Sequence, residues 1–122
     1  MTHYMKKVKF VLEFAKNLND KGIFFPVFGI CLGFEQMIMI TLEELYIGDC
    51  EGKDQSNTTE LTQTGHESRL FSNFSLTERE QISYIPAIYQ SHRKCYSMSE
   101  YKKSPDFRKM YKVTSLARDH NR

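Results

Sequence analysis

Glycine, proline, cysteine and net charge are all scarce in this sequence, and each scarcity excludes a class of protein. With 6 Gly and 3 Pro among 122 residues, the chain is neither collagen-like nor compositionally disordered. Three Cys are too few for a disulfide-dense scaffold. The formal net charge of +2 is too small to indicate nucleic acid or a membrane as a partner. The remaining class is a globular chain, long enough for a single domain over residues 1–122.

The three cysteines follow no metal-binding or redox spacing. Because Cys31, Cys50 and Cys95 include no C-x-x-C pair, we predict neither a zinc site nor a disulfide framework. Their number is odd, so at least one thiol must be free. Cys50 and Cys95 lie in no motif and are interpreted as structural.

Residues 22–42 are the longest weakly charged stretch, with Glu35 as their only charge. About 20 apolar residues can span a bilayer. Pro26, three glycines and the polar pair of Glu35 and Gln36 interrupt this stretch, however. We therefore predict a buried strand followed by a helix rather than a membrane span. The N-terminus also lacks the apolar segment of a secretory signal.

Hydrophobic periodicity predicts alternating helices and strands. The expected helices cover residues 4–18, 34–45, 77–85, which a capping box from Thr77 to Glu80 opens, and a segment from Ser104. The expected buried face of the first helix is Tyr4, Val8, Val11, Ala15 and Leu18. The expected strands cover residues 23–28, 88–98 and 112–117, and residues 48–65 are expected to form a turn, a hairpin or a loop. This order favours an α/β fold with a parallel sheet.

One motif carries chemistry. Gly29-Ile30-Cys31-Leu32-Gly33 stands between the predicted buried strand and helix, which is the context of a nucleophile elbow. Glycines two residues either side of the nucleophile avoid collisions with neighbouring backbone. The helix N-terminus favours the thiolate of Cys31 and Glu35 opposes it, while the Leu32 N–H is placed to bind an oxyanion. The alternative is an inert buried thiol in a glycine-containing turn.

The residues around this motif resemble a known family. Residues 25–35, FPVFGICLGFE, are similar to the nucleophile segment of gamma-glutamyl hydrolases, which belong to the class I glutamine amidotransferase-like superfamily. Residues 4–20, 66–74, 89–92 and 107–113 match further segments of that family in the same order. The resemblance implies an incomplete three-layer α/β/α, flavodoxin-like domain with a parallel central sheet.

The resemblance also implies a function. It implies a cysteine omega-peptidase that cuts γ-glutamyl bonds in folylpoly-γ-glutamate, with Cys31 as nucleophile and the Leu32 N–H as oxyanion donor. Gly29 and Gly33 then shape the elbow, His92 binds substrate, and no cofactor or metal is needed. The partner is the small polyglutamate substrate, with no nucleic acid and no membrane, and a homo-oligomer is left open. Family members are lysosomal, vacuolar or extracellular.

The chain departs from this family at both ends. The family's catalytic base is a histidine followed by proline and glutamate, whereas the four histidines here are followed by Tyr4, Glu67, Arg93 and Asn121. The family's first strands and its Gly-Gly loop, which supplies a second oxyanion donor, are also missing. We therefore expect the middle part of a larger enzyme, a truncated copy or a pseudoenzyme. Such a chain alone should hydrolyse γ-glutamyl bonds weakly or not at all.

Two alternative functions share the same fold: a glutaminase domain that feeds ammonia to a partner synthase, and a non-catalytic scaffold. A basic segment bears on the choice of ligand, because residues 92–112 carry seven basic and two acidic side chains with aromatic residues between them. The segment is interpreted as a solvated helix face or as a positive rim for a polyanionic substrate. Nucleic-acid binding is disfavoured because the sequence contains no known nucleic-acid-binding module.

Overall fold

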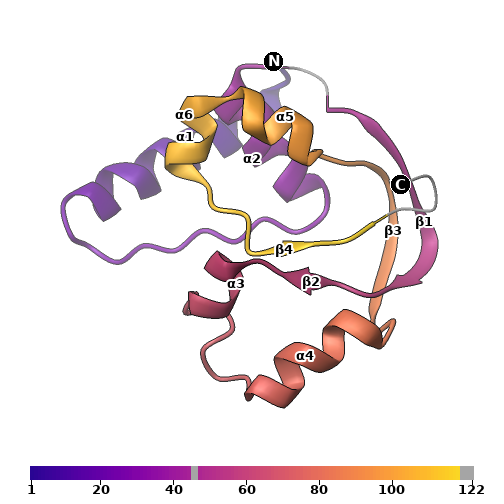
Figure 1. Ribbon diagram of the computed structural model, residues 1–122. Helices are drawn as coiled ribbons and strands as arrows, with labels where there is room; N and C mark the ends of the chain where they lie inside the picture. The colour runs from indigo at the N-terminus through magenta and orange to yellow at the C-terminus, as the bar shows by residue number, and fades with distance from the viewer. Residues whose placement is uncertain (45–46, 119–122) are drawn as a thin grey trace. The chain divides into compact units, whose positions relative to one another are not determined.

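The computed structural model describes residues 1–44 and 47–118, which fall into two compact units, Met1–Gly48 and Asp49–Arg122 (Figure 1). In chain order the elements are α1 (His3–Asp20), α2 (Leu32–Leu42), β1 (Asp49–Asn57), β2 (Glu60–Leu61), α3 (Gln63–Glu67), α4 (Leu76–Tyr84), β3 (Ile88–Lys94), α5 (Met98–Lys103), α6 (Pro105–Met110) and β4 (Ser115–Leu116). None of the described helices is long and apolar enough to cross a membrane.

The first unit consists of α1 packed against α2. The side chain of Thr2 caps α1 by accepting a hydrogen bond of 3.2 Å from the Met5 N–H. The buried residues of α1 are Met5, Leu12 and Ala15, whereas Tyr4 and Val11 are exposed. The predicted helix is therefore confirmed, and Ala15 is buried as expected, but Met5 and Leu12 take the buried places expected for Tyr4 and Val11. The predicted end of the second helix at Leu45 lies outside the described residues.

The predicted buried strand over residues 23–28 is wrong, because this segment forms neither a helix nor a strand. Phe24, Phe28 and Ile30 are 72%, 81% and 72% exposed. A strand needs neighbours for its N–H and C=O groups, and no described strand pairs with this segment. The amide of Asn19 supplies part of that pairing instead, since it donates to the Phe25 carbonyl at 2.8 Å and accepts from the Phe25 N–H at 3.0 Å.

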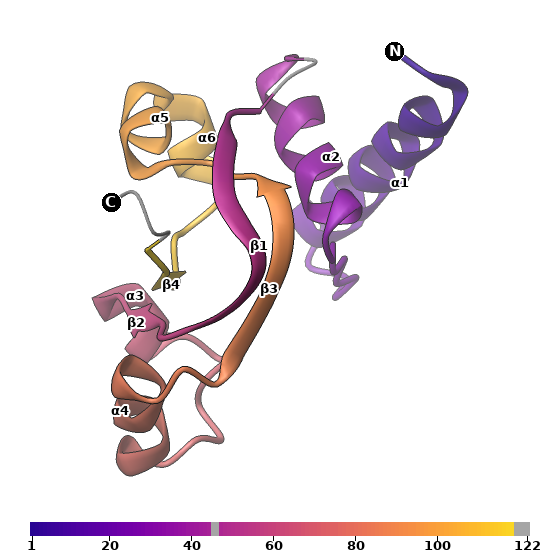
Figure 2. The same cartoon turned by 90° about the vertical axis from the view of Figure 1, so that its right-hand side faces the viewer.

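The second unit contains both sheets of the described residues, and each is a two-stranded antiparallel pair (Figure 2). In the longer pair, β1 lies beside β3 with Asp49 opposite Lys94 and Gly52 opposite His92. The architecture is thus a mixture of helices and strands, but the expected parallel central sheet is not found among the described residues. Residues 48–65 supply strands to both sheets instead of folding into a hairpin with each other.

Helix ends in the second unit follow local capping chemistry. Ser75, not Thr77, caps α4 and forms a capping box with Glu78. That helix ends before Pro86, as predicted, with Ile85 in an extended conformation. The expected helix after Ser104 is confirmed as α6, with Ser104 as its cap. The short helices α3 and α5 were not expected from periodicity, because each spans fewer than two turns.

A small aromatic core holds α5 and α6 together. Phe107 is buried, and its ring lies 4.7 Å from the ring of Tyr111 and 5.0 Å from that of Tyr96, centroid to centroid. The Tyr101 ring meets Phe107 edge-on at 6.0 Å, and the Tyr101 hydroxyl donates to the Tyr111 carbonyl. Phe107 is therefore a core residue, and the partly buried rings of Tyr96, Tyr101 and Tyr111 pack around it.

Candidate functional site

Cys31 stands in an unusual backbone conformation just before α2. Its φ and ψ are 52° and −117°, and its side chain carries a free, exposed thiol. A positive φ is uncommon for a residue with a Cβ and is held only where the surroundings impose it. The thiol is therefore not the buried thiol that the alternative interpretation of the motif required.

Local backbone hydrogen bonds and one glycine impose this turn. The Gly33 N–H donates to the Ile30 carbonyl at 2.9 Å, and the Glu35 N–H donates to the Cys31 carbonyl at 3.1 Å. A Cβ on Gly29 would lie 2.9 Å from both Gly33 C and Phe34 N, which is closer than backbone atoms allow. A Cβ on Gly33 would meet no atom within 4 Å. The close approach that requires glycine therefore occurs at Gly29.

The first turn of α2 leaves a donor beside the thiol. Among the described residues, the Leu32 N–H has no hydrogen-bond acceptor, as expected for the first residue of a helix. Glu35 is the acidic residue of that turn. No described residue hydrogen-bonds to Cys31 Sγ. The arrangement can present a sulfur nucleophile next to an open backbone donor, but the described residues show no base joined to the sulfur.

His92 lies on β3, in the second unit, and its ring is already engaged. Its Nδ1 atom is 3.1 Å from the Lys94 carbonyl oxygen, and its Nε2 atom is 3.2 Å from Gln90 Oε1. The ring also lies over Gly52, where a Cβ would be 2.7 Å from its Cε1 atom. A contact between this ring and a substrate would have to replace one of these interactions.

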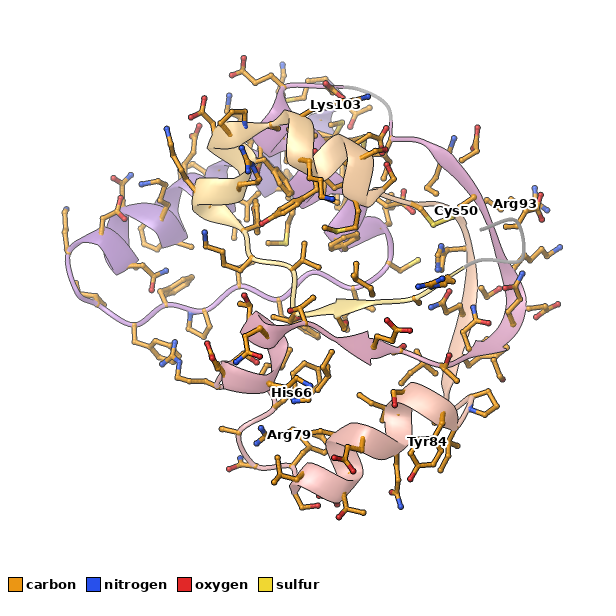
Figure 3. All side chains as sticks on the ribbon, viewed as in Figure 1. Cys50, His66, Arg79, Tyr84, Arg93 and Lys103 are labelled. Atoms are coloured by element: carbon orange, nitrogen blue, oxygen red, sulfur yellow. A yellow bond between two sulfur atoms is a disulfide. The ribbon has the colours of Figure 1, made fainter. Side chains whose placement is uncertain are left out.

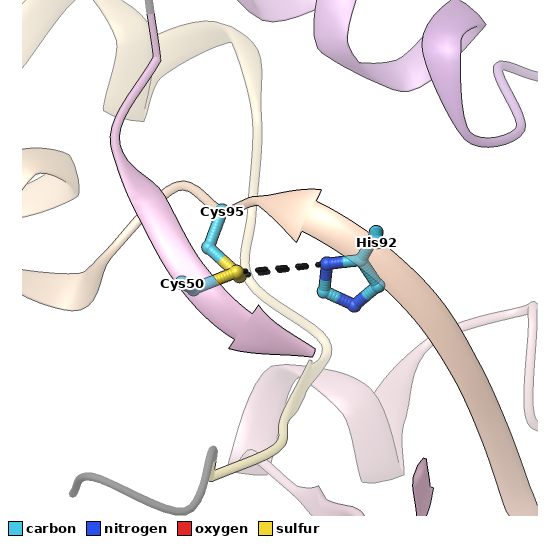
Figure 4. A group of neighbouring side chains, drawn as sticks. All are labelled: Cys50, His92 and Cys95. Atoms are coloured by element: carbon cyan, nitrogen blue, oxygen red, sulfur yellow. Dashed lines mark hydrogen bonds between the residues drawn. A yellow bond between two sulfur atoms is a disulfide. The ribbon is translucent and has the colours of Figure 1, made fainter. Parts of the chain in front are cut away.

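Cys50 and Cys95 form a disulfide with a Cα–Cα distance of 5.7 Å (Figure 4). Local spacing did not indicate this disulfide, because these cysteines are 45 positions apart and meet through the pairing of β1 with β3. Each sulfur lies 3.6 Å from His92 Nδ1. The sequence held one local sign of this cluster: His92 and Cys95 are three positions apart, at and just after the end of β3.

The contacts around His66 and within the basic segment stabilise local structure. Arg79 donates to the backbone carbonyls of His66, Ser72 and Phe74, which ties the segment before α4 to that helix (Figure 3). In the basic segment, Lys109 pairs with Asp106 at 2.9 Å. The basic residues in the last turns of α5 and α6 are Lys102, Lys103, Arg108 and Lys109. Helix C-termini favour cations. The placement of these residues therefore supports the interpretation of the basic segment as a solvated helix face.

No family model matches the chain. Among curated proteins it is similar to gamma-glutamyl hydrolases: gamma-glutamyl hydrolase 1 of Arabidopsis thaliana is 25% identical over 120 residues, covering 97% of this chain and 34% of that protein. The Homo sapiens enzyme is 24% identical over 116 residues, covering 95% and 36%, and the Mus musculus enzyme is 22% identical over 116 residues, covering 95% and 37%. These findings confirm the resemblance inferred from residues 25–35. The chain spans about a third of the length of these relatives.

Proposed function

We propose that this chain contributes the nucleophile segment of a cysteine hydrolase that cleaves γ-glutamyl amide bonds, with poly-γ-glutamyl folate as the substrate class. The observation that carries the proposal is the exposed thiol of Cys31, held at a positive φ beside the open first turn of α2. The similarity of the chain to gamma-glutamyl hydrolases supports the γ-glutamyl amide as the type of bond that is cleaved. The chain spans about a third of the length of those relatives. The hydrolase activity of a whole enzyme is therefore itself a proposal.

The proposed chemistry uses two groups of the turn. Cys31 Sγ, as thiolate, attacks the γ-carbonyl carbon and forms a carbon–sulfur bond, and the Leu32 N–H stabilises the resulting oxyanion. Collapse of this intermediate breaks the carbon–nitrogen bond, and the leaving amine takes up a proton. Water then hydrolyses the thioester, which releases the γ-carboxylate and restores the thiol. Since no described residue hydrogen-bonds to Cys31 Sγ, we expect turnover by the 122-residue chain to be slow, by roughly 10²–10⁴ relative to a base-assisted hydrolase.

An electrophilic substrate analogue tests the nucleophile without requiring turnover. We would treat the chain with a glutamine analogue that carries a diazoketone at the γ-position, and locate the adduct by peptide mass spectrometry. We expect labelling of Cys31 in the folded chain to be about tenfold faster than in urea, since a tenfold effect needs only about 1.4 kcal/mol of recognition. Pre-incubation with poly-γ-glutamate should slow the labelling.

Two controls separate recognition from simple thiol reactivity. Iodoacetamide carries no γ-glutamyl group, so poly-γ-glutamate should not slow its reaction with Cys31. The Cys31→Ser variant should give no adduct with the diazoketone. Equal labelling rates in the folded and the urea-unfolded chain, with no protection by poly-γ-glutamate, would refute the proposed function.

A further inference from the structure

Three side chains that can bind metal ions meet where β1 and β3 pair, in the second unit. They are Cys50 on β1, His92 on β3 and Cys95 just after β3, and their ligand atoms all lie within 4.8 Å of one another (Figure 4). All three side chains are partly buried. We propose that, once the Cys50–Cys95 disulfide is reduced, these residues bind one Zn²⁺ ion through two thiolates and one imidazole nitrogen.

The strand pairing builds this cluster. Between the pair of Asp49 with Lys94 and the pair of Gly52 with His92, β1 contains three steps and β3 contains two, so β1 carries one extra residue. A bulge of this kind re-aims the neighbouring side chains. Gly52 leaves room for the imidazole, because any Cβ there would collide with the ring. The His92 ring therefore sits against both sulfur atoms.

The distances suit a tetrahedral zinc site. Zinc lies about 2.3 Å from a thiolate and about 2.0–2.1 Å from an imidazole nitrogen, so a nitrogen and a sulfur ligand are about 3.5 Å apart. His92 Nδ1 is 3.6 Å from Cys50 Sγ and 3.6 Å from Cys95 Sγ. Among the three ligand atoms, the two sulfurs must separate to about 3.8 Å, which cleavage of their bond permits. Three protein ligands leave one position for water.

The surroundings of His92 also suit a metal ligand. When one imidazole nitrogen binds zinc, the other usually donates its proton to an oxygen of the protein, which fixes the ring. Gln90 Oε1 lies 3.2 Å from His92 Nε2 and also accepts from the side chain of Asn57 at 3.3 Å. The Lys94 carbonyl, 3.1 Å from Nδ1, competes for that nitrogen, so zinc binding exchanges this contact for a metal bond.

Reduction by a dithiol converts the disulfide form of the cluster into the form that binds zinc. A small dithiol reduces the disulfide by two electrons, giving the thiols of Cys50 and Cys95, and is itself oxidised to a cyclic disulfide. Binding of Zn²⁺ then releases the two thiol protons and leaves both sulfurs as thiolates on the metal. An added small-molecule disulfide reverses this step: it takes two electrons from the two thiolates and is reduced to its thiols, the Cys50–Cys95 bond forms again, and Zn²⁺ is released. The cluster is thus a redox-dependent zinc site, and it is independent of the hydrolase proposed for Cys31.

The experiment titrates zinc into the full chain in a Cys31→Ser background, which removes the third thiol. After reduction with a dithiol and anaerobic desalting, calorimetry should show one Zn²⁺ per chain, and Co²⁺ should give thiolate-to-metal charge-transfer absorption. The oxidised chain should show neither signal. Failure of the reduced, folded chain to bind a stoichiometric ion would overturn the proposal.

Variants separate the site from adventitious binding. Cys50→Ser, Cys95→Ser and His92→Ala should each weaken zinc binding by about 100-fold or more, and Gln90→Ala by about 10- to 100-fold. His92→Cys should restore tight binding, because a third thiolate replaces the imidazole. His66→Ala, which changes a histidine outside the cluster, should leave the affinity unchanged. Equal affinities for His92→Ala and His66→Ala, with both chains folded by circular dichroism, would also overturn the proposal.

Discussion

The backbone at Cys31 stores free energy in the folded chain. A non-glycine residue held at a φ of 52° costs on the order of 1–3 kcal/mol, and glycine removes that cost because it has no Cβ. The hydrogen bonds that the Gly33 and Glu35 N–H groups donate to the carbonyls of Ile30 and Cys31 hold the turn against the strain. Such strain beside an exposed thiol is typical of a site where geometry matters more than stability.

Replacing Cys31 by glycine should therefore stabilise the chain. We expect Cys31→Gly to raise the free energy of unfolding by about 1 kcal/mol relative to Cys31→Ala, which keeps the Cβ and hence the strain. Elsewhere in proteins the same comparison normally favours alanine by about 0.5–1 kcal/mol, so the sign of the difference is diagnostic. Urea unfolding followed by far-ultraviolet circular dichroism measures it. An alanine variant more stable than the glycine variant would show that the turn is unstrained.

The two glycines of the elbow motif should respond differently to substitution. Gly29→Ala forces a Cβ to within 2.9 Å of backbone atoms and should cost about 1–3 kcal/mol of stability. Gly33→Ala is the matched control, since its Cβ meets open space inside α2 and alanine favours helices by up to about 1 kcal/mol. The same urea titration compares both variants with the parent chain. Equal losses of stability in the two variants would contradict the asymmetry of the turn.

At the scale of elements, the sequence predicts those helices and strands that are determined by interactions between residues close together in the chain. The helices α1, α2, α4 and α6 follow from periodicity and capping residues within a few positions of each other. The apolar run of residues 23–28 predicted burial, but burial depends on partners that the described residues do not provide. The pairing of β1 with β3, and with it the contact of His92 with two cysteines, depends on residues far apart in the chain and could not be derived from local pattern.

The capping box of α4 should make stability depend on acid pH. The N–H and hydroxyl of Ser75 donate to the Glu78 carboxylate and hold the pKa of Glu78 below its ordinary value. A lowered pKa in the folded state contributes stability above the unfolded pKa, and this contribution is lost as the pH falls through the folded value. Glu78→Gln removes the titration, so its unfolding free energy should fall less than that of the parent chain below about pH 4.3.

Glu80 offers a matched control for this pH dependence, because it lies on the same helix but takes no part in the capping box. Unfolding midpoints in urea at pH 7 and pH 3 provide the comparison. We expect Glu80→Gln to follow the parent chain. If Glu78→Gln and Glu80→Gln show the same acid sensitivity, the capping carboxylate does not account for it.

The exposed apolar segment between α1 and α2 should bind apolar dyes. Contiguous exposed apolar residues are unusual in a soluble chain and mark sites of association. We expect the double change Phe24→Ser and Phe28→Ser to lower the fluorescence of 1-anilinonaphthalene-8-sulfonate by about half or more. Leu76→Ser, which removes an exposed apolar side chain from a different segment, should change it little. Unaltered dye binding in the double variant would place the dye site elsewhere.

For the molecule as a whole, the disulfide is a covalent constraint on the second unit. It closes a loop of 45 residues, and restricting a loop of that length in the unfolded chain is worth about 4 kcal/mol in the chain-entropy model. We expect the Cys50→Ser/Cys95→Ser double variant to lose a large part of these roughly 4 kcal/mol from its free energy of unfolding in urea. Cys31→Ser should not lower the free energy of unfolding. The reduced parent chain with a chelator should match the double variant.

Added Zn²⁺ should stabilise the reduced parent but not the double variant, because a ligand that binds only the folded state stabilises it by mass action. Equal zinc stabilisation of both chains would show that the cysteines carry no metal-dependent stability.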